Sequence, residues 1–220
     1  MAALLVIVAA GSGSRLGRAE PKALVPLGGR PLLSWTLDAF ANVAFARTVV
    51  TAPPAFLADF ERLVGARGRV IAGGETRAAS VRRGVEALVA AADDVVAIHD
   101  AARPFLRVEE IRSVLAAAEA TGAAIAATPV VDTIKRVAAG RVVATVDRSE
   151  LAGAATPQAF RADVLRQVVA AGGEATDEAA LCERLGLPVA VVPVSRLSFK
   201  ITTPEDLELA EGILTARRRS

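Results

Sequence analysis

The chain of 220 residues has very few of the residues that several classes of protein depend on. Its one cysteine, Cys182, excludes an internal disulfide framework and a metal cluster built on cysteine ligands. Its one histidine, His99, excludes a zinc site with several histidine ligands. Tyrosine is absent and tryptophan occurs once, so the sequence offers no aromatic platform on which nucleic-acid bases would stack. We therefore expect no disulfide scaffold and no nucleic-acid partner.

Long apolar segments and a strong charge imbalance are missing as well. The longest apolar stretch near the N-terminus, Ala2–Ala10, is far shorter than the roughly 20 residues that span a bilayer, and it lacks the basic start of a secretory signal. The formal net charge is only +2, and the one basic run is Arg217–Arg219. Without a basic stripe, nucleic-acid binding is disfavoured again. We expect a soluble cytoplasmic protein with no membrane partner.

Lysine is the scarcest of the charged residues. Of 26 basic residues, all but Lys22, Lys135 and Lys200 are arginines. A compositional drift toward arginine and alanine explains the scarcity. It does not explain why lysine is kept at these three positions, each of which lies in a segment that the motifs below associate with substrate binding.

What the sequence does contain is a regular alternation of apolar runs and helical patterns. Apolar residues make up 53% of the chain, enough to bury a core, and the length favours a single domain over residues 1–220. Short apolar runs predict buried strands at Leu4–Ala9, Arg47–Thr51, Val70–Ala72, Asp94–Ile98, Ala123–Thr128 and Val189–Pro193. Helices are predicted between them at Pro31–Phe40, Ala55–Leu63, Ala78–Ala90, Val108–Ala120, Arg161–Ala170 and Pro204–Ala216. Such alternation predicts an α/β fold with a mostly parallel sheet and helices on both faces.

One stretch, between Val130 and Gln158, breaks this alternation. β-Branched residues on both sides of Ala139–Gly140 predict a β-hairpin with a short turn. A lone hairpin is only marginally stable in water. We therefore expect it to pack against something else, for which a second subunit is a natural candidate.

A glycine-rich segment follows the first predicted strand. Gly11 and Gly13 would let backbone N–H groups approach an anion, and Arg15 and Lys22 would add positive charge suited to a polyphosphate. A dinucleotide-binding motif would need a glycine at position 16, which is Leu16, and the Gly-Lys-Ser/Thr of a Walker loop is absent. The alternative is a tight turn with solvated basic residues.

The segment His99–Pro104 lies at the carboxyl end of a predicted strand, the edge at which open parallel sheets bind ligands. Asp100 is placed to hold a divalent ion over phosphates, and Arg103 to bind a phosphate. The alternative is that these two residues only pair with each other in a turn. For His99 we favour a buried structural role over that of a general base, because chemistry at a phosphate can proceed by positioning and charge stabilisation.

Four further segments carry polar groups. Gly73–Ser80 again follows a strand, and Glu75 and Ser80 could read base edges. Polar residues on the hairpin could hold a phosphorylated substrate, although read alone they are better explained as its solvated face. The remaining two segments are Thr176–Glu178, which could be no more than a helix N-cap, and Ser198–Asp206, where Lys200 precedes a capped helix.

Taken in order, seven of these motifs resemble one family, the 2-C-methyl-D-erythritol 4-phosphate cytidylyltransferases of the non-mevalonate isoprenoid pathway. The motifs are Ala-Ala-Gly-x-Gly-x-Arg with Pro-Lys, Gly-Gly-x-x-Arg-x-x-Ser-Val, His-Asp-Ala-Ala-Arg-Pro, Asp-Thr-Ile-Lys, Thr-Pro-Gln-x-Phe, Thr-Asp-Glu and Lys-Ile-Thr-x-Pro-Glu-Asp-Leu. The resemblance extends from about Leu4 to Glu211. It implies a Rossmann-like nucleotidyltransferase fold and a homodimer joined through a hairpin arm at about residues 131–156. It also implies attack of a polyol phosphate on the α-phosphorus of CTP, with a divalent cation, usually Mg²⁺.

The resemblance also implies roles for individual residues. Arg15 and Lys22 would stabilise the transition state, and Lys200 and Arg148 would position the acceptor, with Arg148 reaching in from the partner subunit. Matches to the positions that contact CTP are Val8, Ala9, Ala10, Gly11, Gly13, Gly74, Glu75, Ser80 and Ala101. Matches to the acceptor pocket are Asp100, Arg103, Thr133, Thr156 and Thr176, and Asp100 is also the expected metal ligand.

The sequence departs from the family pattern at three places. Glu75 stands where Asp is common, Ser198 stands where Asn is usual, and Ala23–Leu24 replaces a pair that usually contains Gln. These changes leave the contact to the base and the hydrogen bonds at position 198 open.

Other functions share part of this pattern. A ribitol 5-phosphate cytidylyltransferase has the same fold and most of the nucleotide motifs, and a hexose-1-phosphate nucleotidylyltransferase shares fewer of them. A non-catalytic nucleotide-binding module or a structural dimer is a further alternative. It would not need to keep Arg15, Lys22, Asp100 and Lys200, and their presence argues against it. A nicotinamide-dependent oxidoreductase is disfavoured by Leu16.

Overall fold

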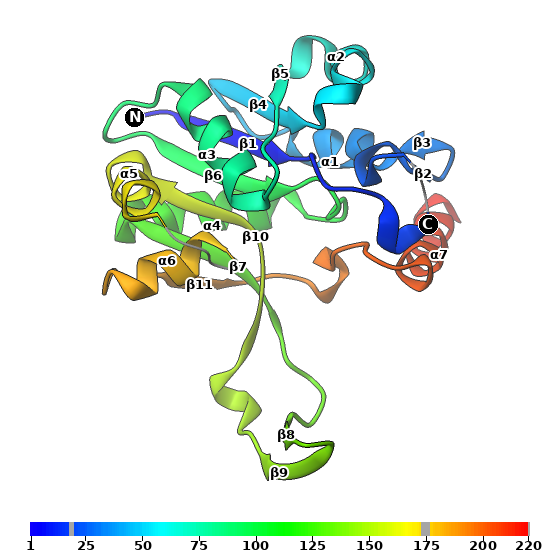
Figure 1. Ribbon diagram of the computed structural model, residues 1–220, viewed down its shortest axis with the longest axis vertical. Coiled ribbons are helices and arrows are strands. Elements are labelled where there is room, and N and C mark those ends of the chain that lie inside the picture. Colours follow the sequence, from blue (N-terminus) through cyan, green and yellow to red (C-terminus); the bar gives the residue numbers. More distant parts are fainter. Residues whose placement is uncertain (18–19, 173–176, 220) are drawn as a thin grey trace.

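The structure is a computed structural model that describes residues 1–17, 20–172 and 177–219. A seven-stranded sheet forms its centre (Figure 1). The sheet strands are β1 (Ala3–Val8), β4 (Arg47–Ala52), β5 (Arg69–Ala72), β6 (Val95–Asp100), β7 (Ala123–Pro129), β10 (Ala152–Arg161) and β11 (Ala190–Pro193).

The strand order places two loops side by side. The order across the sheet is β11-β7-β10-β6-β1-β4-β5, and every neighbouring pair is parallel except those that β10 makes with β6 and β7. From β1 the chain moves outward to β4 and β5, then returns to place β6 on the other side of β1. Loops that leave such a switch point diverge and open a crevice. Val8 of β1 and Asp100 of β6 are register partners, so the segments after them start at one level of this crevice.

Helices cover both faces of the sheet. One face packs against α1 (Leu32–Phe40), α2 (Leu57–Val64) and α4 (Val108–Thr121). The other face packs against α3 (Arg77–Leu88), α5 (Ala162–Ala171) and α6 (Glu178–Arg184). Residues of β1 alternate between the two cores, with Leu5 and Ile7 in the first and Leu4 and Val6 in the second. Burial on both faces accounts for the continuous apolar character of this strand.

A third, smaller core lies at one end of the sheet. Helix α7 (Pro204–Arg219) packs there near the two-stranded ribbon of β2 (Pro26–Leu27) and β3 (Arg30–Pro31). Ile201, just before α7, is fully buried in this core and donates its backbone N–H to Ala102 O. The core therefore ties the segment before α7 to the loop after β6.

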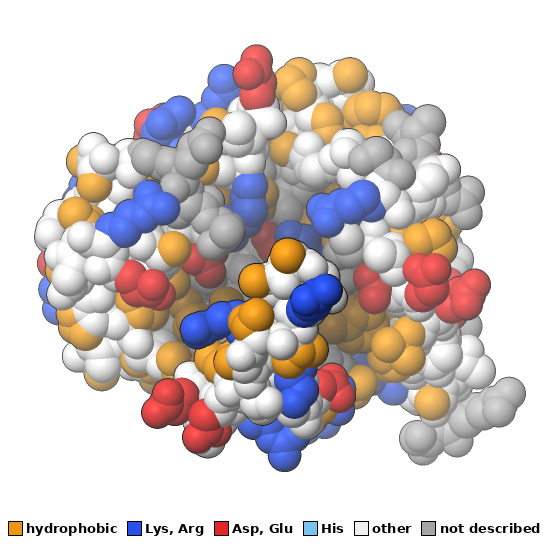
Figure 2. All heavy atoms as spheres, turned by 60° about the horizontal axis from the view of Figure 1, so that its bottom comes forward, with side chains coloured by type: hydrophobic (Ala, Val, Ile, Leu, Met, Phe, Trp, Pro, Cys, Tyr) orange, Lys and Arg blue, Asp and Glu red, His pale blue; other side chains and the backbone are white. Residues whose placement is uncertain are grey.

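A hairpin arm projects from the sheet between β7 and β10 (Figure 1). Its strands are β8 (Lys135–Ala138) and β9 (Arg141–Thr145). The predicted turn is confirmed, and Ala139 and Gly140 both have positive φ, 47° and 73°, as a tight hairpin turn requires. Viewed from the arm end, hydrophobic side chains lie beside Lys and Arg on its surface (Figure 2). The exposed apolar residues of the excursion are Val131, Val137, Val142, Val143 and Leu151.

The α/β fold predicted from the sequence is confirmed, but one central strand was missed. β10 lies between β6 and β7, although its residues were expected to belong partly to the arm. A proline inside a segment argues against a central strand, because it cannot donate to the ladder. Pro157 falls where the β10–β7 register shifts, between Ala154 and Gln158, so that the ladder accommodates it. The excursion therefore ends at Leu151, and Ala155 and Thr156 are buried in the sheet rather than part of the arm.

The other differences are short elements. Helix α6 was anticipated only as a possible N-cap before Glu178, the β2–β3 ribbon was not predicted, and β6 continues to Asp100, two residues beyond the expected strand. Within the described ranges, no helix is both long enough and apolar enough to cross a membrane.

Candidate active site

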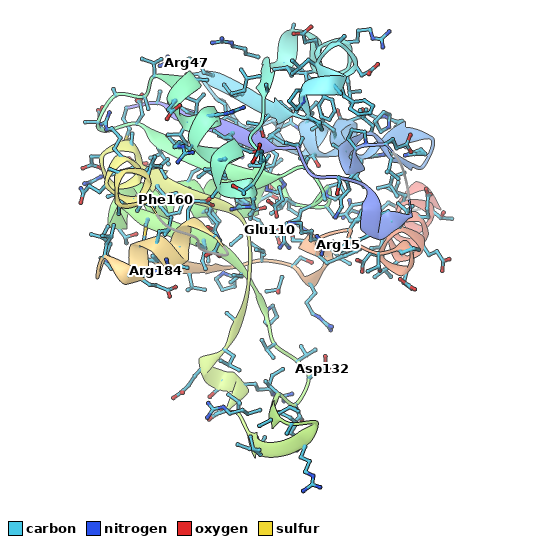
Figure 3. All side chains as sticks on the ribbon, in the orientation of Figure 1. Arg15, Arg47, Glu110, Asp132, Phe160 and Arg184 are labelled. Atoms are coloured by element: carbon cyan, nitrogen blue, oxygen red, sulfur yellow. The ribbon has the colours of Figure 1, made fainter. Side chains whose placement is uncertain are left out.

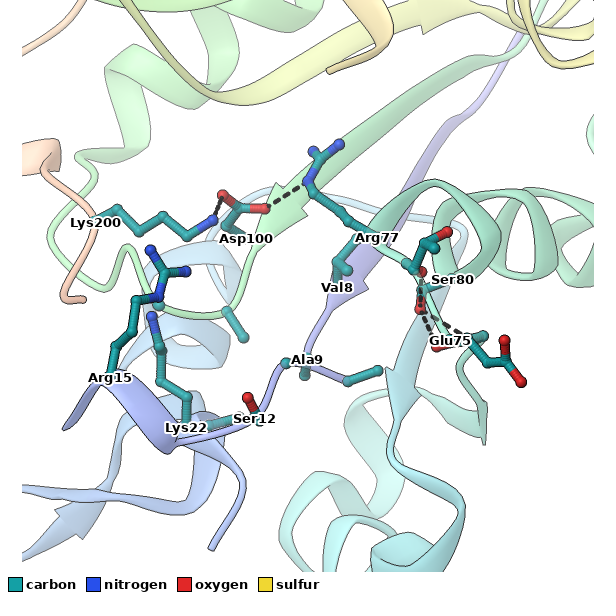
Figure 4. A pocket seen from close by; sticks show the side chains of 17 residues that line it. Val8, Ala9, Ser12, Arg15, Lys22, Glu75, Arg77, Ser80, Asp100 and Lys200 are labelled. Atoms are coloured by element: carbon teal, nitrogen blue, oxygen red, sulfur yellow. Dashed lines mark hydrogen bonds and ion pairs between the residues drawn. The ribbon is translucent and has the colours of Figure 1, made fainter. Parts of the chain in front are cut away.

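A cleft of about 480 Å³ lies at the carboxyl ends of β1 and β6 (Figure 4). Three segments that are distant in sequence form it: the loop after β1, the loop between β5 and α3, and the end of β6. Lys200, from the segment before α7, closes one side. The lining residues are Val8, Ala9, Ala10, Gly11, Ser12, Arg15, Lys22, Ala23, Gly74, Glu75, Thr76, Arg77, Ser80, Asp100, Ala101, Ala102 and Lys200.

The glycine-rich loop presents both backbone and positive charge to the cleft. A Cβ on Gly11 would meet nothing within 4 Å, so this side of the loop faces open space that a ligand can enter. The N–H of Lys22 donates to Gly11 O at 3.3 Å, which folds the chain back and brings the Lys22 side chain into the cleft. Figure 4 shows Arg15, Lys22 and Lys200 on the same side of the cavity.

Lys22 is an ammonium group held in a largely buried position. Only 8% of the residue is exposed, and its Nζ donates to Ile201 O at 3.1 Å. Burial, and after it the positive charges of Lys200 and Arg15, lowers the pKa of Lys22 to about 8. The group is therefore short of negative partners, and an anion in the cleft would satisfy it.

Asp100 lies among three cations. Its Oδ2 accepts from Lys200 Nζ at 2.8 Å, its Oδ1 accepts from Arg77 Nε at 3.2 Å, and Arg103 Nε is 3.8 Å from Oδ2. Burial by itself raises the pKa of Asp100, but Lys200 and Arg77 outweigh it and hold the pKa well below its ordinary value. The carboxylate is therefore charged at neutral pH, and it fixes the positions of the cations that surround it.

Arg77 and Glu178 are site residues that were not predicted from the sequence. Arg77 lines the cleft and bridges two carboxylates, since its Nε bonds Asp100 while its Nη1 donates to both oxygens of Glu178 at 2.9 and 3.0 Å. Glu178, the first residue of α6, is only 4% exposed. The signals were present in the sequence, because Arg77 is the arginine of the Gly-Gly-x-x-Arg motif and Glu178 ends the Thr-Asp-Glu motif. Asp177 caps α6, as the capping alternative predicted, by accepting from the N–H of Ala180.

The loop before α3 is held by its own helix. The Oγ of Ser80 accepts from Gly74 N at 3.0 Å and donates to Thr76 O at 3.0 Å. Ser80 is 1% exposed, so these hydrogen bonds hold the loop in shape at the wall of the cleft. A Cβ on Gly74 would approach the Ala79 side chain to 2.4 Å, which explains why glycine stands there. Glu75 is exposed and lies across the cleft from Lys22 (Figure 4).

His99 is structural, as favoured from the sequence. Its ring is fully buried, with Nε2 3.1 Å from Arg103 O and Nδ1 3.0 Å from Thr156 Oγ1. A carbonyl only accepts, so Nε2 carries the proton and the Thr156 hydroxyl donates to Nδ1. Burial lowers the pKa of His99 to about 4, which keeps the ring neutral. Thr156 Oγ1 also accepts from Asp100 N at 3.0 Å, so this chain of bonds holds the end of β6 in place.

A second cavity of about 360 Å³ adjoins the first. Lys200 lines both cavities and so stands at their boundary. The other lining residues are Arg103, Thr128, Pro129, Val130, Val131, Asp132, Arg196 and Phe199. Figure 3 shows Asp132 partway along the arm, on the segment that leads to β8.

Most of the residues expected to contact CTP line the first cleft. Gly13 is buried and does not line it. Of the expected acceptor residues, Arg103 lines the second cavity and Thr156 lies beneath Asp100. Thr133 and Arg148 are exposed on the arm, where Arg148 donates to Val131 O, and neither lines either of these two cavities of its own subunit. Thr176 lies outside the described residues.

The site is suited to magnesium rather than to a metal ion whose ligands all come from protein side chains. In the part of the chain that the structure describes, no three His, Cys, Asp or Glu side chains come together in a group that could hold a metal ion. Magnesium needs no such group, because it binds one or two carboxylates together with substrate phosphates and water. Asp100 supplies a carboxylate in the cleft, so the residues present fit that ion.

Ser198 has an uncommon environment beside the second cavity. Its backbone carbonyl accepts from Arg103 Nη1 at 2.9 Å. Its Oγ and Arg103 Nε are buried and have no hydrogen-bond partner among the described residues. The serine therefore binds Arg103 through its backbone carbonyl alone. Its hydroxyl does not replace, among the described residues, the side-chain hydrogen bonds that the asparagine usual in the family could form.

A mostly parallel sheet, an open glycine loop and a cluster of cations at the switch point define a nucleotidyltransferase-type α/β protein. The solved enzyme from Thermus thermophilus, a 2-C-methyl-D-erythritol 4-phosphate cytidylyltransferase, has this fold. It superposes with a TM-score of 0.80 at 37% identity, covering 98% of this chain and 100% of its own.

Sequence comparisons place the chain more narrowly. The family model described as 2-C-methyl-D-erythritol 4-phosphate cytidylyltransferase (IspD) matches residues 3–216, and the chain belongs to that family. A relative of that name from Prochlorococcus marinus is 43% identical over 97% of this chain and 98% of its own length. Another from Geobacillus kaustophilus is 41% identical over 96% of each chain.

Proposed function

We propose that the chain transfers the cytidylyl group of CTP to 2-C-methyl-D-erythritol 4-phosphate, yielding 4-diphosphocytidyl-2-C-methyl-D-erythritol and pyrophosphate. The observation that carries this proposal is the position of Lys200. It stands between a nucleotide-sized cleft and a second cationic cavity, so that a phosphate from each can meet beside it. Membership of the family supports the same reaction.

The chemistry requires positive charge more than it requires a base. An oxygen of the acceptor phosphate forms a bond to the α-phosphorus of CTP, and the bond from that phosphorus to the β-phosphate oxygen breaks to release pyrophosphate. A phosphate dianion needs no proton removed before it attacks, which agrees with a buried, neutral His99. What must be overcome is the repulsion between two anions and the charge that develops on the α-phosphoryl oxygens.

Each cation of the cleft has a part in this step. Lys22 and Arg15 stabilise the charge of the triphosphate, and a compact ammonium at Lys22 suits the crowded phosphorus. Lys200 orients the acceptor phosphate toward the α-phosphorus, and Asp100 holds Lys200 in that position at 2.8 Å. The backbone around Gly11 and Gly74 accommodates the ribose and triphosphate, with Glu75 and Ser80 on the side of the base. A magnesium ion bound to Asp100 and the phosphates would neutralise further charge.

We also propose that the enzyme is a homodimer in which the arm of one subunit brings Arg148 and Thr133 to the site of the other. Two observations support this. The arm exposes a row of valines that a partner would cover, and Arg148 lines neither cavity of its own subunit. As a cytidylyltransferase of small molecules, the enzyme is expected to act in the cytoplasm.

The activity is tested by mixing CTP, magnesium and each of two acceptors, methylerythritol phosphate and ribitol 5-phosphate. We expect pyrophosphate and the cytidine diphosphate product with the first acceptor, and a loss of both in Lys22→Ala. Turnover of ribitol 5-phosphate alone would overturn the choice of acceptor. CTP binding without pyrophosphate release would show a non-catalytic nucleotide-binding protein.

The arm is tested by mixing two inactive variants, Lys22→Ala and Arg148→Ala, after mild dissociation. If Arg148 acts across the interface, each mixed dimer has one intact site, and random mixing restores about a quarter of the wild-type activity. If Arg148 acts within its own subunit, or the chain is monomeric, no activity returns. Sedimentation of the wild type measures the oligomeric state independently.

A further inference from the structure

The second cavity contains a cation that the reaction as derived above does not use. Arg196 lines this cavity together with Arg103 and Lys200. Its side chain is exposed and forms no hydrogen bond or ion pair with the rest of the described chain. Arg103 and Lys200, in contrast, both contact Asp100. Arg196 is thus the cation of this cavity that pairs with no carboxylate of the described chain.

The backbone that carries Arg196 is fixed on both sides. Arg196 begins a short 3-10 turn whose preceding residue, Ser195, accepts the N–H of Leu197 at its Oγ, at 3.2 Å. The N–H of Ser195 donates to Glu110 Oε1 of α4 at 2.6 Å. At the end of the turn, Ser198 O accepts from Arg103 Nη1 at 2.9 Å. Because both ends are held, the Arg196 side chain starts from a defined point on the cavity wall.

The charges and shape of the cavity match a phosphorylated polyol. Three cations and one carboxylate, Asp132, line the cavity. Asp100 also pairs with Lys200 and Arg103 from the side of the first cleft, and Arg196 adds positive charge that suits a phosphate. The Asp132 carboxylate and the Thr128 hydroxyl can accept from the hydroxyl groups of a polyol. Val130, Val131 and Phe199 supply apolar surface beside them.

We propose that Arg196 binds the phosphate of the acceptor, on the side away from Lys200, and thereby strengthens the binding of the phosphorylated polyol. This inference rests on the proposed function. The guanidinium fork would hold oxygens of the phosphate that do not attack, while Lys200 directs the attacking oxygen toward the first cleft. Arg196 would then act on acceptor binding and leave CTP binding alone.

The test compares Arg196→Ala and Arg196→Lys with the wild type. A charge-assisted contact of this kind leads us to expect that Arg196→Ala raises the KM of the acceptor about 10- to 100-fold, with the KM of CTP unchanged. Arg196→Lys keeps the charge but loses the fork, and is expected to fall between the two. Arg62→Ala, which removes an exposed arginine of α2 that lines neither cavity, is the matched control and is expected to behave as wild type.

Two results would overturn the inference. One is an acceptor KM of Arg196→Ala within about twofold of wild type. The other is an equal rise in the KM of both substrates, which would indicate a general disturbance of the site.

A second measurement separates this inference from the proposed function. The phosphorylated polyol and inorganic phosphate are titrated calorimetrically into enzyme that holds a CTP analogue with a methylene bridge between the α- and β-phosphates. If wild-type enzyme binds the polyol phosphate but, with CTP itself, forms no product, the proposed function fails. Unchanged binding in Arg196→Ala defeats the role of Arg196 alone.

Discussion

The Nζ atom of Lys200 donates a hydrogen bond of 2.8 Å to Oδ2 of Asp100, although 100 residues separate them in the sequence. The pair joins the end of β6 to the segment before α7, at the wall shared by the two cavities. Asp100 therefore does more than balance charge, because it holds an ammonium group where two phosphates have to meet.

Asp100→Asn tests this relationship. The amide keeps the shape of the side chain but loses the charge that holds Lys200 and Arg77, so both cations are free to move. We expect kcat/KM to fall by about 100-fold or more, with the circular dichroism spectrum retained. The control is Asp93→Asn, which removes an exposed carboxylate that forms an ion pair with the N-terminus. Activity within about twofold of wild type in Asp100→Asn would contradict the role of the pair.

Lys22→Arg tests whether the site needs an ammonium rather than merely a positive charge. Lys22 is buried and its Nζ already contacts Ile201 O, so a longer and planar guanidinium does not fit the same space. We expect turnover to fall by about 100-fold. Lys135→Arg on the exposed arm, where lysine bonds Thr145 Oγ1, is the matched comparison with a much milder effect. Full activity in Lys22→Arg would show that charge alone suffices.

The pH profile offers a test of Lys22 in the unmodified enzyme. Because its pKa is lowered to about 8, the free enzyme loses the ammonium charge as the pH rises through that value. We expect kcat/KM for CTP to decline above pH 8, approaching about a tenfold fall per pH unit. Bound triphosphate favours the charged form, so kcat should hold to a higher pH than kcat/KM. A kcat/KM that stays flat to about pH 10 would argue against a charged Lys22 in CTP capture.

Arg77 and Glu178 are tested together because they form one unit. In Arg77→Lys the single ammonium group cannot bridge Asp100 and Glu178 as the guanidinium does. Glu178→Gln removes the buried carboxylate charge that Arg77 contacts. We expect either change to lower kcat/KM by about tenfold and the free energy of unfolding by about 1–3 kcal/mol, since Arg77 is partly exposed. In the double variant the losses should not add, which a double-mutant cycle measures as coupling. Additive losses would show that the two residues act independently.

Local pattern predicted much of the fold, and the failures have a common cause. Apolar runs such as Leu4–Ala9 and the helical pattern of Val108–Ala120 are set by which side chains must be buried, so they can be recognised without tertiary information. β10 was missed because its burial depends on neighbours on both sides, and because a proline inside a segment argues against a central strand. The partners of Arg77 were missed for a related reason: Glu178 lies 101 residues away, and no periodicity links the two.

The sequence by itself determined the alternation of strands and helices, the glycine loops and the chemical types of the site residues, because these depend on neighbours along the chain. Only the tertiary structure decided which of them meet. It brought Lys22 and Lys200 to one cleft and left Lys135 on the arm, and it placed Arg196 and Arg103 in the lining of the same second cavity. The physical reason is that a parallel sheet collects the ends of distant strands at one edge, and this depends on strand order, which the alternation alone does not specify.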